Sequence, residues 1–197
     1  MKYGNILTGG IGCGKSTVSN LLALEGFHIL SADKIAHKIL DKNATLISQY
    51  FGNEILCDSG IDRKKLGNIV FNDKEKKELL ESILHPLIQK NISNECKILE
   101  SKKKPYFIEI PLYFESSFKY EAEYIICIYA TKDMQIDRVI KRDNLTKQEA
   151  IKRIESQIDI EIKRSKSDFV IENTSDLKAL QNNVNMFLNR FYEIYNA

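Results

Sequence analysis

The chain has 197 residues, of which 43% are hydrophobic and 28% are charged, the composition of an ordinary globular protein with one core and small additional lobes. Its net charge of +2 is close to balanced, so nothing in it indicates a nucleic-acid-binding surface. No apolar run reaches the ~18 residues of a membrane-spanning helix, and no basic segment followed by an apolar one precedes the first strand, so we expect neither a membrane span nor an export signal.

The first predicted elements are an apolar strand over residues 3–7 and a helix over residues 17–24, joined by a glycine-rich turn. Between Gly9 and Ser16 this turn contains the P-loop pattern: a glycine, four residues and then Gly-Lys-Ser. A glycine-rich turn that binds nothing would need neither the Lys-Ser pair nor a helix directly after it. We therefore predict a phosphate site, in which Lys15 reaches the β- and γ-phosphates and Ser16 ligates Mg²⁺. The predicted nucleotide-binding residues are Gly10, Gly12, Cys13, Gly14, Lys15, Ser16 and Thr17.

A second strand over residues 27–30 leads through Ser31 to Asp33 and a helix that continues to about residue 40. Ligands of open parallel α/β sheets bind at the carboxyl ends of the strands, which is where this aspartate lies. We expect the strand to be the neighbour of the one before the phosphate-binding turn, and therefore favour a catalytic role for Asp33. The alternative is that Asp33 only caps the N-terminus of the helix.

Residues 43–104 show helical patterns and no clear strand. Asn72 and Glu75 have the spacing of a capping arrangement, and Pro86 fits the first turn of a new helix. The insertion is large for a simple crossover, so we predict a lobe that holds the second substrate. His85 is a candidate hydrogen-bond donor to that substrate, and a cap or packing role for it is equally open. The predicted helices cover residues 45–51, 63–71, 73–84 and 86–100.

The third predicted strand, residues 106–110, is a buried type that is interrupted by Glu109 near its end. A carboxylate there is costly to bury unless it is paired or lies near a metal ion. In P-loop proteins an acid at this position often reaches the magnesium ion, so Glu109 is a second candidate metal contact. The next strand, residues 124–130, has the nearly continuous apolar character of a strand that is covered on both faces.

A helix over residues 135–142 presents Arg138 and Arg142 on one face, because they are four residues apart. A capping box at residues 146–149 starts another helix, whereas residues 158–162 fit either a helix or a strand. A basic segment at this place is where a mobile lid would close over ATP, and its arginines would neutralise charge on the transferred phosphoryl group. Solvated helical faces carry the same pattern and are the alternative.

A fifth strand over residues 168–173 and a C-terminal helix capped by Ser175 or Asp176 complete the chain. The alternation of strands and helices predicts an α/β fold with a five-stranded parallel sheet flanked by helices. We interpret one apolar stripe of the last helix as core; it consists of Leu177, Leu180, Val184, Phe187, Leu188 and Phe191.

Short motifs that are typical of one protein family are spread along nearly the whole chain. They are Leu7 to Thr17, Ala32-Asp33, Leu84-His85-Pro86-Leu87, Pro111-Leu112, Glu115, Gln135, Arg138, Arg142-Asp143, Arg153, Gln157, Ser167 to Ile171 and Asn173. In these residues the chain resembles the dephospho-CoA kinase family, which completes coenzyme A by phosphorylating a ribose 3′-hydroxyl. Ser31 and Cys13 depart from the pattern, since that family usually has Asp and Ser at these positions.

The resemblance implies a P-loop kinase core of residues 1–33, 105–134 and 167–197, a helical CoA-binding lobe of residues 34–104 and a helical lid of residues 135–166. It also implies that ATP and Mg²⁺ are used to phosphorylate the small-molecule substrate dephospho-CoA, as the last step of CoA biosynthesis. In that scheme Asp33 accepts the proton of the 3′-hydroxyl, and the lid brings Arg138 and Arg142 to the transition state. His85 contacts the substrate.

Three alternatives to this function differ in class. Another small-molecule or nucleoside monophosphate kinase would share the core but not the helical insertion. A GTP-dependent switch would need an N/T-K-x-D motif, and Met134 stands where its acid belongs after Thr131-Lys132-Asp133. A nucleotide-binding module without catalysis would not need Lys15, Ser16, Asp33 and the lid arginines together.

The four cysteines show no metal-ligand spacing, so we predict free thiols in a reducing cytoplasm. Cys13 lies near a helix start that lowers thiol pKa values, which would suit a redox sensor. A small packing residue is the interpretation that we favour for it. The cysteines are Cys13, Cys57, Cys96 and Cys127.

Overall fold

A computed structural model of the protein divides into two compact units, Met1–Leu30 with Leu99–Ala197, and Ser31–Ile98. The first unit contains the residues of the predicted lid, 135–166, and the second covers most of the predicted lobe, 34–104. The functional assignment of both segments stays a prediction. The structure describes residues 1–58, 60–116 and 118–195.

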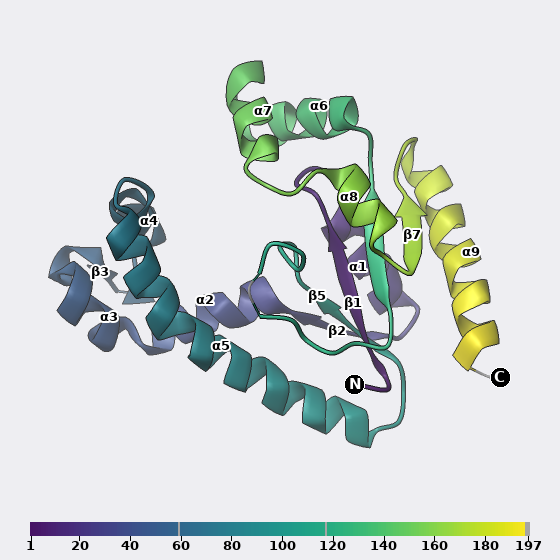
Figure 1. The fold of residues 1–197 in the computed structure, drawn as a ribbon, viewed down its shortest axis with the longest axis horizontal. Helices are drawn as coiled ribbons and strands as arrows, with labels where there is room; N and C mark the ends of the chain where they lie inside the picture. The colour runs from purple at the N-terminus through teal and green to yellow at the C-terminus, as the bar shows by residue number, and fades with distance from the viewer. Residues whose placement is uncertain (59, 117, 196–197) are drawn as a thin grey trace. The chain divides into compact units, whose positions relative to one another are not determined.

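The first unit is built on a five-stranded sheet with the strand order β2-β5-β1-β6-β7 (Figure 1). Strand β1 is central, all of its residues are buried, and it pairs in parallel with β5 and β6. The expectation that β2 would be the neighbour of β1 is wrong, because β5 lies between them. Strands that are consecutive in sequence need not pair in a sheet with crossovers. The strands are β1 Gly4–Gly9, β2 His28–Ser31, β5 Tyr106–Glu109, β6 Ile125–Tyr129 and β7 Phe169–Glu172.

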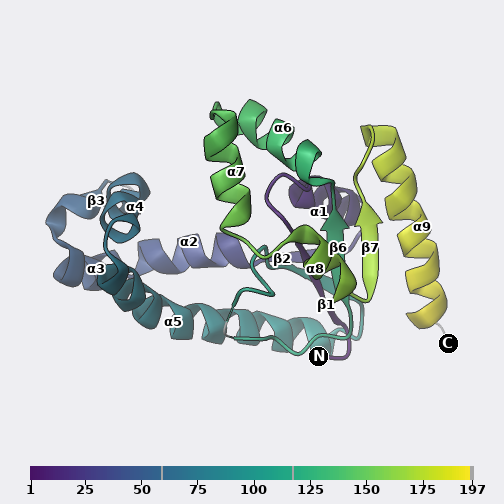
Figure 2. The same cartoon turned by 45° about the horizontal axis from the view of Figure 1, so that its top comes forward.

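Among the described residues of the first unit, the helices beside this sheet are α1 Lys15–Leu24, α6 Lys132–Asp143, α7 Lys147–Glu155, α8 Ile160–Ser165 and α9 Leu177–Tyr195. The predicted capping box of α7 is confirmed, and Asp176 caps α9 by accepting from the Ala179 N–H at 2.8 Å. Residues 158–162, which fitted either a helix or a strand, lead into a helix: Asp159 accepts from the Glu161 N–H and starts α8 at Ile160. In Figures 1 and 2, α8 crosses in front of β6, and the Tyr129 hydroxyl donates to Glu161 at 2.6 Å.

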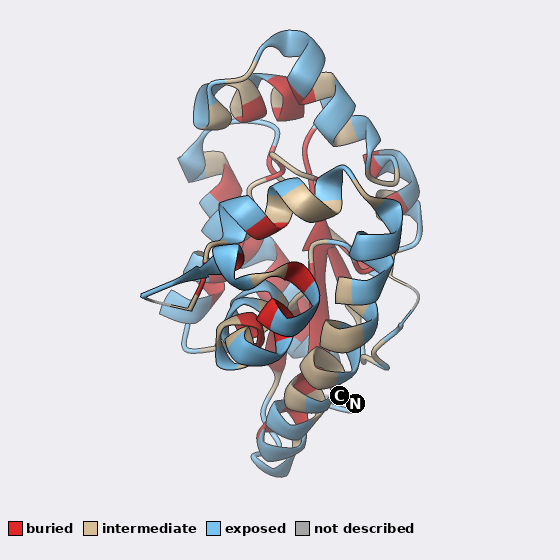
Figure 3. Ribbon diagram, turned by 90° about the vertical axis from the view of Figure 1, so that its left-hand side faces the viewer, coloured by how far each residue is buried: buried red, intermediate tan, exposed pale blue. Residues whose placement is uncertain are grey.

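The main core lies where α1 and α9 pack on the inner strands, and the buried residues in Figure 3 follow the strands and the inner sides of helices. The predicted stripe of α9 is buried from Leu180 to Phe191. Leu177 does not belong to it, because 64% of this residue is exposed. Within the part of the chain that the structure describes, no helix is long and apolar enough to cross a membrane.

The second unit is mainly helical, but it contains a short antiparallel hairpin that the sequence did not predict. Its two strands have two residues each, with Leu56 opposite Ile61, which is too short for a periodic pattern. A small apolar core joins this hairpin to α2, α3 and α4. The elements are α2 Ala32–Lys42, α3 Ala44–Phe51, a 3₁₀ turn η1 Asn53–Ile55, β3 Leu56–Cys57, β4 Gly60–Ile61, α4 Arg63–Phe71 and α5 Lys74–Ser101, whose last turn belongs to the first unit.

Helix α5 corrects two predictions. Its cap is Asp73, which accepts from the Lys76 N–H at 3.0 Å, whereas the Asn72 amide donates to Asn68 in the preceding helix. Pro86 does not start a new helix but lies inside α5. Proline removes one helical hydrogen bond. Apolar residues on both sides of it favour continuing the helix: Leu80, Ile83 and Leu84 pack on the core of the second unit, and Ile92 is buried further along.

Candidate nucleotide-binding site

The phosphate-binding loop, residues 10–14, connects β1 to α1 as the sequence predicts. Gly12 and Gly14 have φ angles of 78° and 88°, which favour glycine because it has no Cβ. Gly14 is the N-cap of α1 and supplies no side chain to it, so the first N–H groups of the helix receive no side-chain cap. An uncapped helix N-terminus after a glycine loop is a binding site for anions.

The loop glycines are also required by the side chains that pack against them. A Cβ on Gly10 would lie 2.6 Å from Oε1 of Gln135, and one on Gly12 would lie 2.9 Å from the carbonyl oxygen of the same residue. A Cβ on Gly14 would overlap the amide nitrogen of Asn173. The loop therefore fits closely between α6 and the residue after β7.

Polar side chains from distant parts of the chain bind the loop backbone. Arg138 donates to the carbonyls of Gly12 at 3.3 Å and Asn173 at 3.0 Å, and the Asn173 amide donates to the Cys13 carbonyl at 2.9 Å. The oxygen Oε1 of Gln157 accepts from the Ile11 N–H at 3.0 Å. Sequence reasoning matched Asn173 and Gln157 to a family pattern but gave neither a role.

Lys15 and the first turn of α1 are arranged around this loop. The Lys15 ammonium donates to the carbonyls of Gly9 at 3.0 Å and Gly10 at 2.9 Å. Ser16 and Thr17 are exposed. The predicted nucleotide-binding residues therefore lie together on the loop and the first turn of α1, where the Lys15 ammonium and the positive ends of backbone N–H dipoles are found.

Glu109 is the last residue of β5 and lies opposite Leu7 of β1. Its Oε2 accepts from the Ser19 hydroxyl at 3.1 Å, so the carboxylate is directed to α1, one turn after Ser16. A hydroxyl and a carboxylate are oxygen donors of the kind that Mg²⁺ prefers, with substrate phosphates and water as its other ligands. The two residues fit the predicted metal site. Among the described residues, no group of three or more His, Cys, Asp or Glu side chains forms a metal site.

Arg142 differs from Arg138 in its surroundings although both lie on α6. It is exposed and binds Asp143 through two hydrogen bonds of 2.8 and 3.0 Å, and Arg153 of α7 contacts the same carboxylate at 2.6 Å. The Arg142 guanidinium, with Arg153, holds the pKa of Asp143 below its usual range. This group of charges joins the ends of α6 and α7.

The other two predicted site residues belong to the second unit. Asp33 is exposed in the first turn of α2, whose cap is the Ser31 hydroxyl, which accepts from the Lys34 N–H at 3.4 Å. The alternative that Asp33 is the cap is therefore wrong. His85 is exposed on α5.

Cys13 is fully buried, and burial raises the pKa of its thiol even though Lys15 is nearby. Burial also raises the pKa of Cys127 to about 12. Both thiols are therefore protonated at neutral pH and poor nucleophiles. This agrees with a packing role for Cys13 rather than a redox role.

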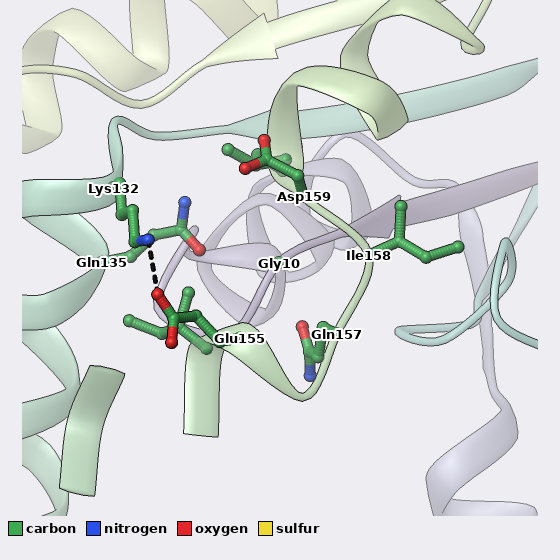
Figure 4. A pocket seen from close by; sticks show the side chains of 9 residues that line it. Gly10, Lys132, Gln135, Glu155, Gln157, Ile158 and Asp159 are labelled. Atoms are coloured by element: carbon green, nitrogen blue, oxygen red, sulfur yellow. Dashed lines mark hydrogen bonds and ion pairs between the residues drawn. The ribbon is translucent and has the colours of Figure 1, made fainter. Parts of the chain in front are cut away.

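A cavity of about 260 Å³ lies beside the loop (Figure 4). The Lys132–Glu155 ion pair of 2.9 Å, drawn as a dashed line, connects α6 to α7 at its edge. Gln157 lies on the link that follows Glu155, across the view from Lys132 and Gln135. The lining residues are Gly10, Lys132, Gln135, Ile154, Glu155, Gln157, Ile158, Asp159 and Ile160.

Comparison with known proteins covers both units. A sequence model of the family "CoaE: Dephospho-CoA kinase" matches residues 6–179. The chain belongs to the dephospho-CoA kinase family. The dephospho-CoA kinase of Helicobacter hepaticus is 46% identical over 191 residues, which are 95% of this chain and 92% of that protein. The enzyme of Helicobacter pylori strain 26695 is 43% identical over 190 residues, 95% of this chain and 97% of that protein.

Solved structures agree with this family assignment and with the predicted fold. The dephospho-CoA kinase from Campylobacter jejuni has a TM-score of 0.75 at 40% identity and covers 97% of this chain and 98% of its own. A shikimate kinase from Acinetobacter baumannii has a TM-score of 0.51 at 16% identity, covering 96% of this chain and 93% of its own. The second likeness shows the fold alone. The prediction of a P-loop kinase fold with a five-stranded parallel sheet is confirmed.

Proposed function

We propose that this chain transfers the terminal phosphoryl group of ATP to the ribose 3′-hydroxyl of dephospho-CoA, giving coenzyme A and ADP, the last step of CoA biosynthesis. The observation that carries the proposal is the match of the dephospho-CoA kinase family over residues 6–179, which includes the phosphate-binding loop and all of the second unit. A cytoplasmic location is part of the proposal.

The loop and Lys15 would hold the triphosphate. The N–H groups at the start of α1 have no side-chain cap, so phosphate oxygens can accept from them. Lys15 would exchange two neutral carbonyl acceptors for anionic phosphate oxygens, which form stronger charge-assisted bonds. Ser16 and Glu109 would hold Mg²⁺, which when bound neutralises charge on the β- and γ-phosphates.

Asp33 would accept the proton of the 3′-hydroxyl, as its exposed carboxylate is not used to cap α2. Arg138 would support the loop that it already contacts and stabilise negative charge there, and Arg142 would act from the far end of the same helix. We assign the lid to residues 135–166 and CoA binding to residues 34–104, with His85 as a substrate contact.

The test is an assay of ADP release with dephospho-CoA as acceptor, compared with nucleosides, nucleoside monophosphates and shikimate under the same conditions. We expect dephospho-CoA to give the highest kcat/KM, and mass spectrometry of the product to locate the new phosphate on the 3′ oxygen. Faster turnover of another acceptor would assign a different kinase activity. ATP binding without turnover of any acceptor would favour a binding module.

A further inference from the structure

The peptide group between Gly10 and Ile11 is held at both of its polar atoms. The Lys15 ammonium donates to its carbonyl oxygen at 2.9 Å, and Gln157 accepts from its N–H at 3.0 Å. Lys15 comes from the helix that follows the loop, whereas Gln157 is 146 residues from Ile11 in the sequence. Two independent side chains therefore fix the orientation of one peptide group at the edge of the phosphate site.

ATP binding would break the Lys15 contact of this peptide group and leave the Gln157 contact in place. For Lys15 to reach the β- and γ-phosphates it would release the Gly10 carbonyl, which then keeps only a longer backbone hydrogen bond, from the Cys13 N–H at 3.3 Å. If the peptide group rotated, the Gly10 carbonyl oxygen could face a phosphate and repel it, and the Ile11 N–H would need another acceptor. Of the two side-chain contacts described here, the Gln157 contact is then the one that still holds the peptide group.

The link that carries Gln157 is itself held in place. The Glu115 carboxylate accepts from the Ile158 N–H at 3.1 Å and pairs with the Lys163 ammonium at 2.5 Å. The Lys163 side chain is fully buried and the Glu115 side chain is 19% exposed, so the pair is largely shielded from water. Asp159 caps α8 directly after the link. Gln157 thus projects from a backbone that is bound on its C-terminal side, not from a free loop.

We infer that Gln157 is a positioning residue for phosphoryl transfer: it keeps the Gly10–Ile11 peptide group in its ATP-binding orientation once Lys15 has moved to the phosphates. The inference rests on the proposed use of ATP, and not on the identity of the acceptor. It gives the α7–α8 link a direct contact with the nucleotide site.

The experiment compares Gln157→Leu with Gln157→Glu. Leucine has a similar volume but cannot accept a hydrogen bond, whereas glutamate keeps an acceptor for the Ile11 N–H. ATP affinity is measured by calorimetry without dephospho-CoA, so that the result does not depend on the proposed acceptor. Exchange of the Ile11 amide proton is followed by NMR, and thermal unfolding is recorded for every variant. Gln181→Leu, at an exposed position of α9, is the matched control.

We expect Gln157→Leu to weaken ATP binding by about three- to tenfold, the effect of one hydrogen bond, and to speed Ile11 exchange. Its unfolding midpoint should fall only slightly below that of the control, because the hydrogen bond that it loses is also present without ATP. Gln157→Glu should restore slow exchange of the Ile11 amide. ATP affinity in Gln157→Leu equal to that of the wild type would overturn the inference, as would Ile11 exchange in this variant that stays as slow as in the wild type. Absence of dephospho-CoA phosphorylation by the wild type would instead count against the proposed function.

Discussion

The contacts of single residues in the loop explain why a nucleotide site needs more than its motif. Gly10, Gly12 and Gly14 leave no room for a Cβ against Gln135 and Asn173. Substituting any of them would force its packing partner to move. The Lys15 ammonium donates to two loop carbonyls, and phosphate oxygens would be stronger, charge-assisted acceptors for it.

A single substitution tests the proposed role of Asp33 as the base. Asp33→Asn removes the proton acceptor but keeps the size of the side chain, so turnover should fall by about 10²- to 10⁴-fold. ATP affinity should stay within about twofold, because the phosphate-binding N–H groups and Lys15 are unchanged. Stopped-flow ADP release and calorimetry measure the two quantities.

Asp137→Asn, at an exposed position of α6, is the matched control for the loss of one carboxylate. Turnover of Asp33→Asn close to that of this control would remove Asp33 from the mechanism.

Asp143 joins helices α6 and α7, and Arg142 and Arg153 hold its pKa below its usual range. A carboxyl group whose pKa is lower in the folded protein contributes stability above its unfolded pKa of about 3.9 and loses it as the pH falls through the folded pKa. Asp143→Asn should therefore lower the unfolding midpoint at neutral pH, and the difference from wild type should close below about pH 4.

Thermal unfolding at several pH values measures this difference. Because the arginines are half exposed, added salt should reduce it. A difference that is the same at every pH would mean that the charge of Asp143 is not its cause.

The Glu115–Lys163 pair joins α8 to the segment after β5. Lys163→Met leaves the Glu115 carboxylate without its counter-ion, and its Oε2 already has no hydrogen-bond donor among the described residues. We expect the free energy of unfolding to fall by about 3–5 kcal/mol. Denaturant unfolding measures it, and the double variant Glu115→Leu with Lys163→Met should recover part of the loss. A double variant that is less stable by the sum of both single losses would contradict a coupled pair.

The elements also differ in how well local sequence predicts them. The capping box of α7 is confirmed because its bonds are made within four residues, Thr146 to Glu149. Local signals around Asn72 and Pro86 were misleading, since packing on both sides of the proline holds α5 together. The β3–β4 hairpin is too short to carry a period, and α8 depends on the single cap of Asp159.

Binding of ATP should increase the free energy of unfolding of the whole protein. A ligand at a hundred times its Kd adds about 2.7 kcal/mol to the free energy of unfolding, so Mg²⁺ and ATP should raise the unfolding midpoint with concentration. Lys15→Met should move this response to higher ATP concentration, because the β- and γ-phosphates lose a charge-assisted partner. Thermal unfolding with ATP and with AMP compares the two. An equal response to AMP would mean that contacts to the β- and γ-phosphates contribute little to the affinity.

The sequence alone determined the phosphate-binding loop, the five strands and the family to which the chain belongs. The loop and the strands each follow from contiguous residues, such as the eight from Gly9 to Ser16, whose local geometry follows from glycine and helix chemistry. The family follows from short motifs that are spread along the chain. Only the tertiary structure decided that β5 separates β1 from β2, and that Arg138, Gln157 and Asn173 hold the loop. Those contacts join residues 126 to 160 positions apart, and chain packing rather than any local pattern brings them together.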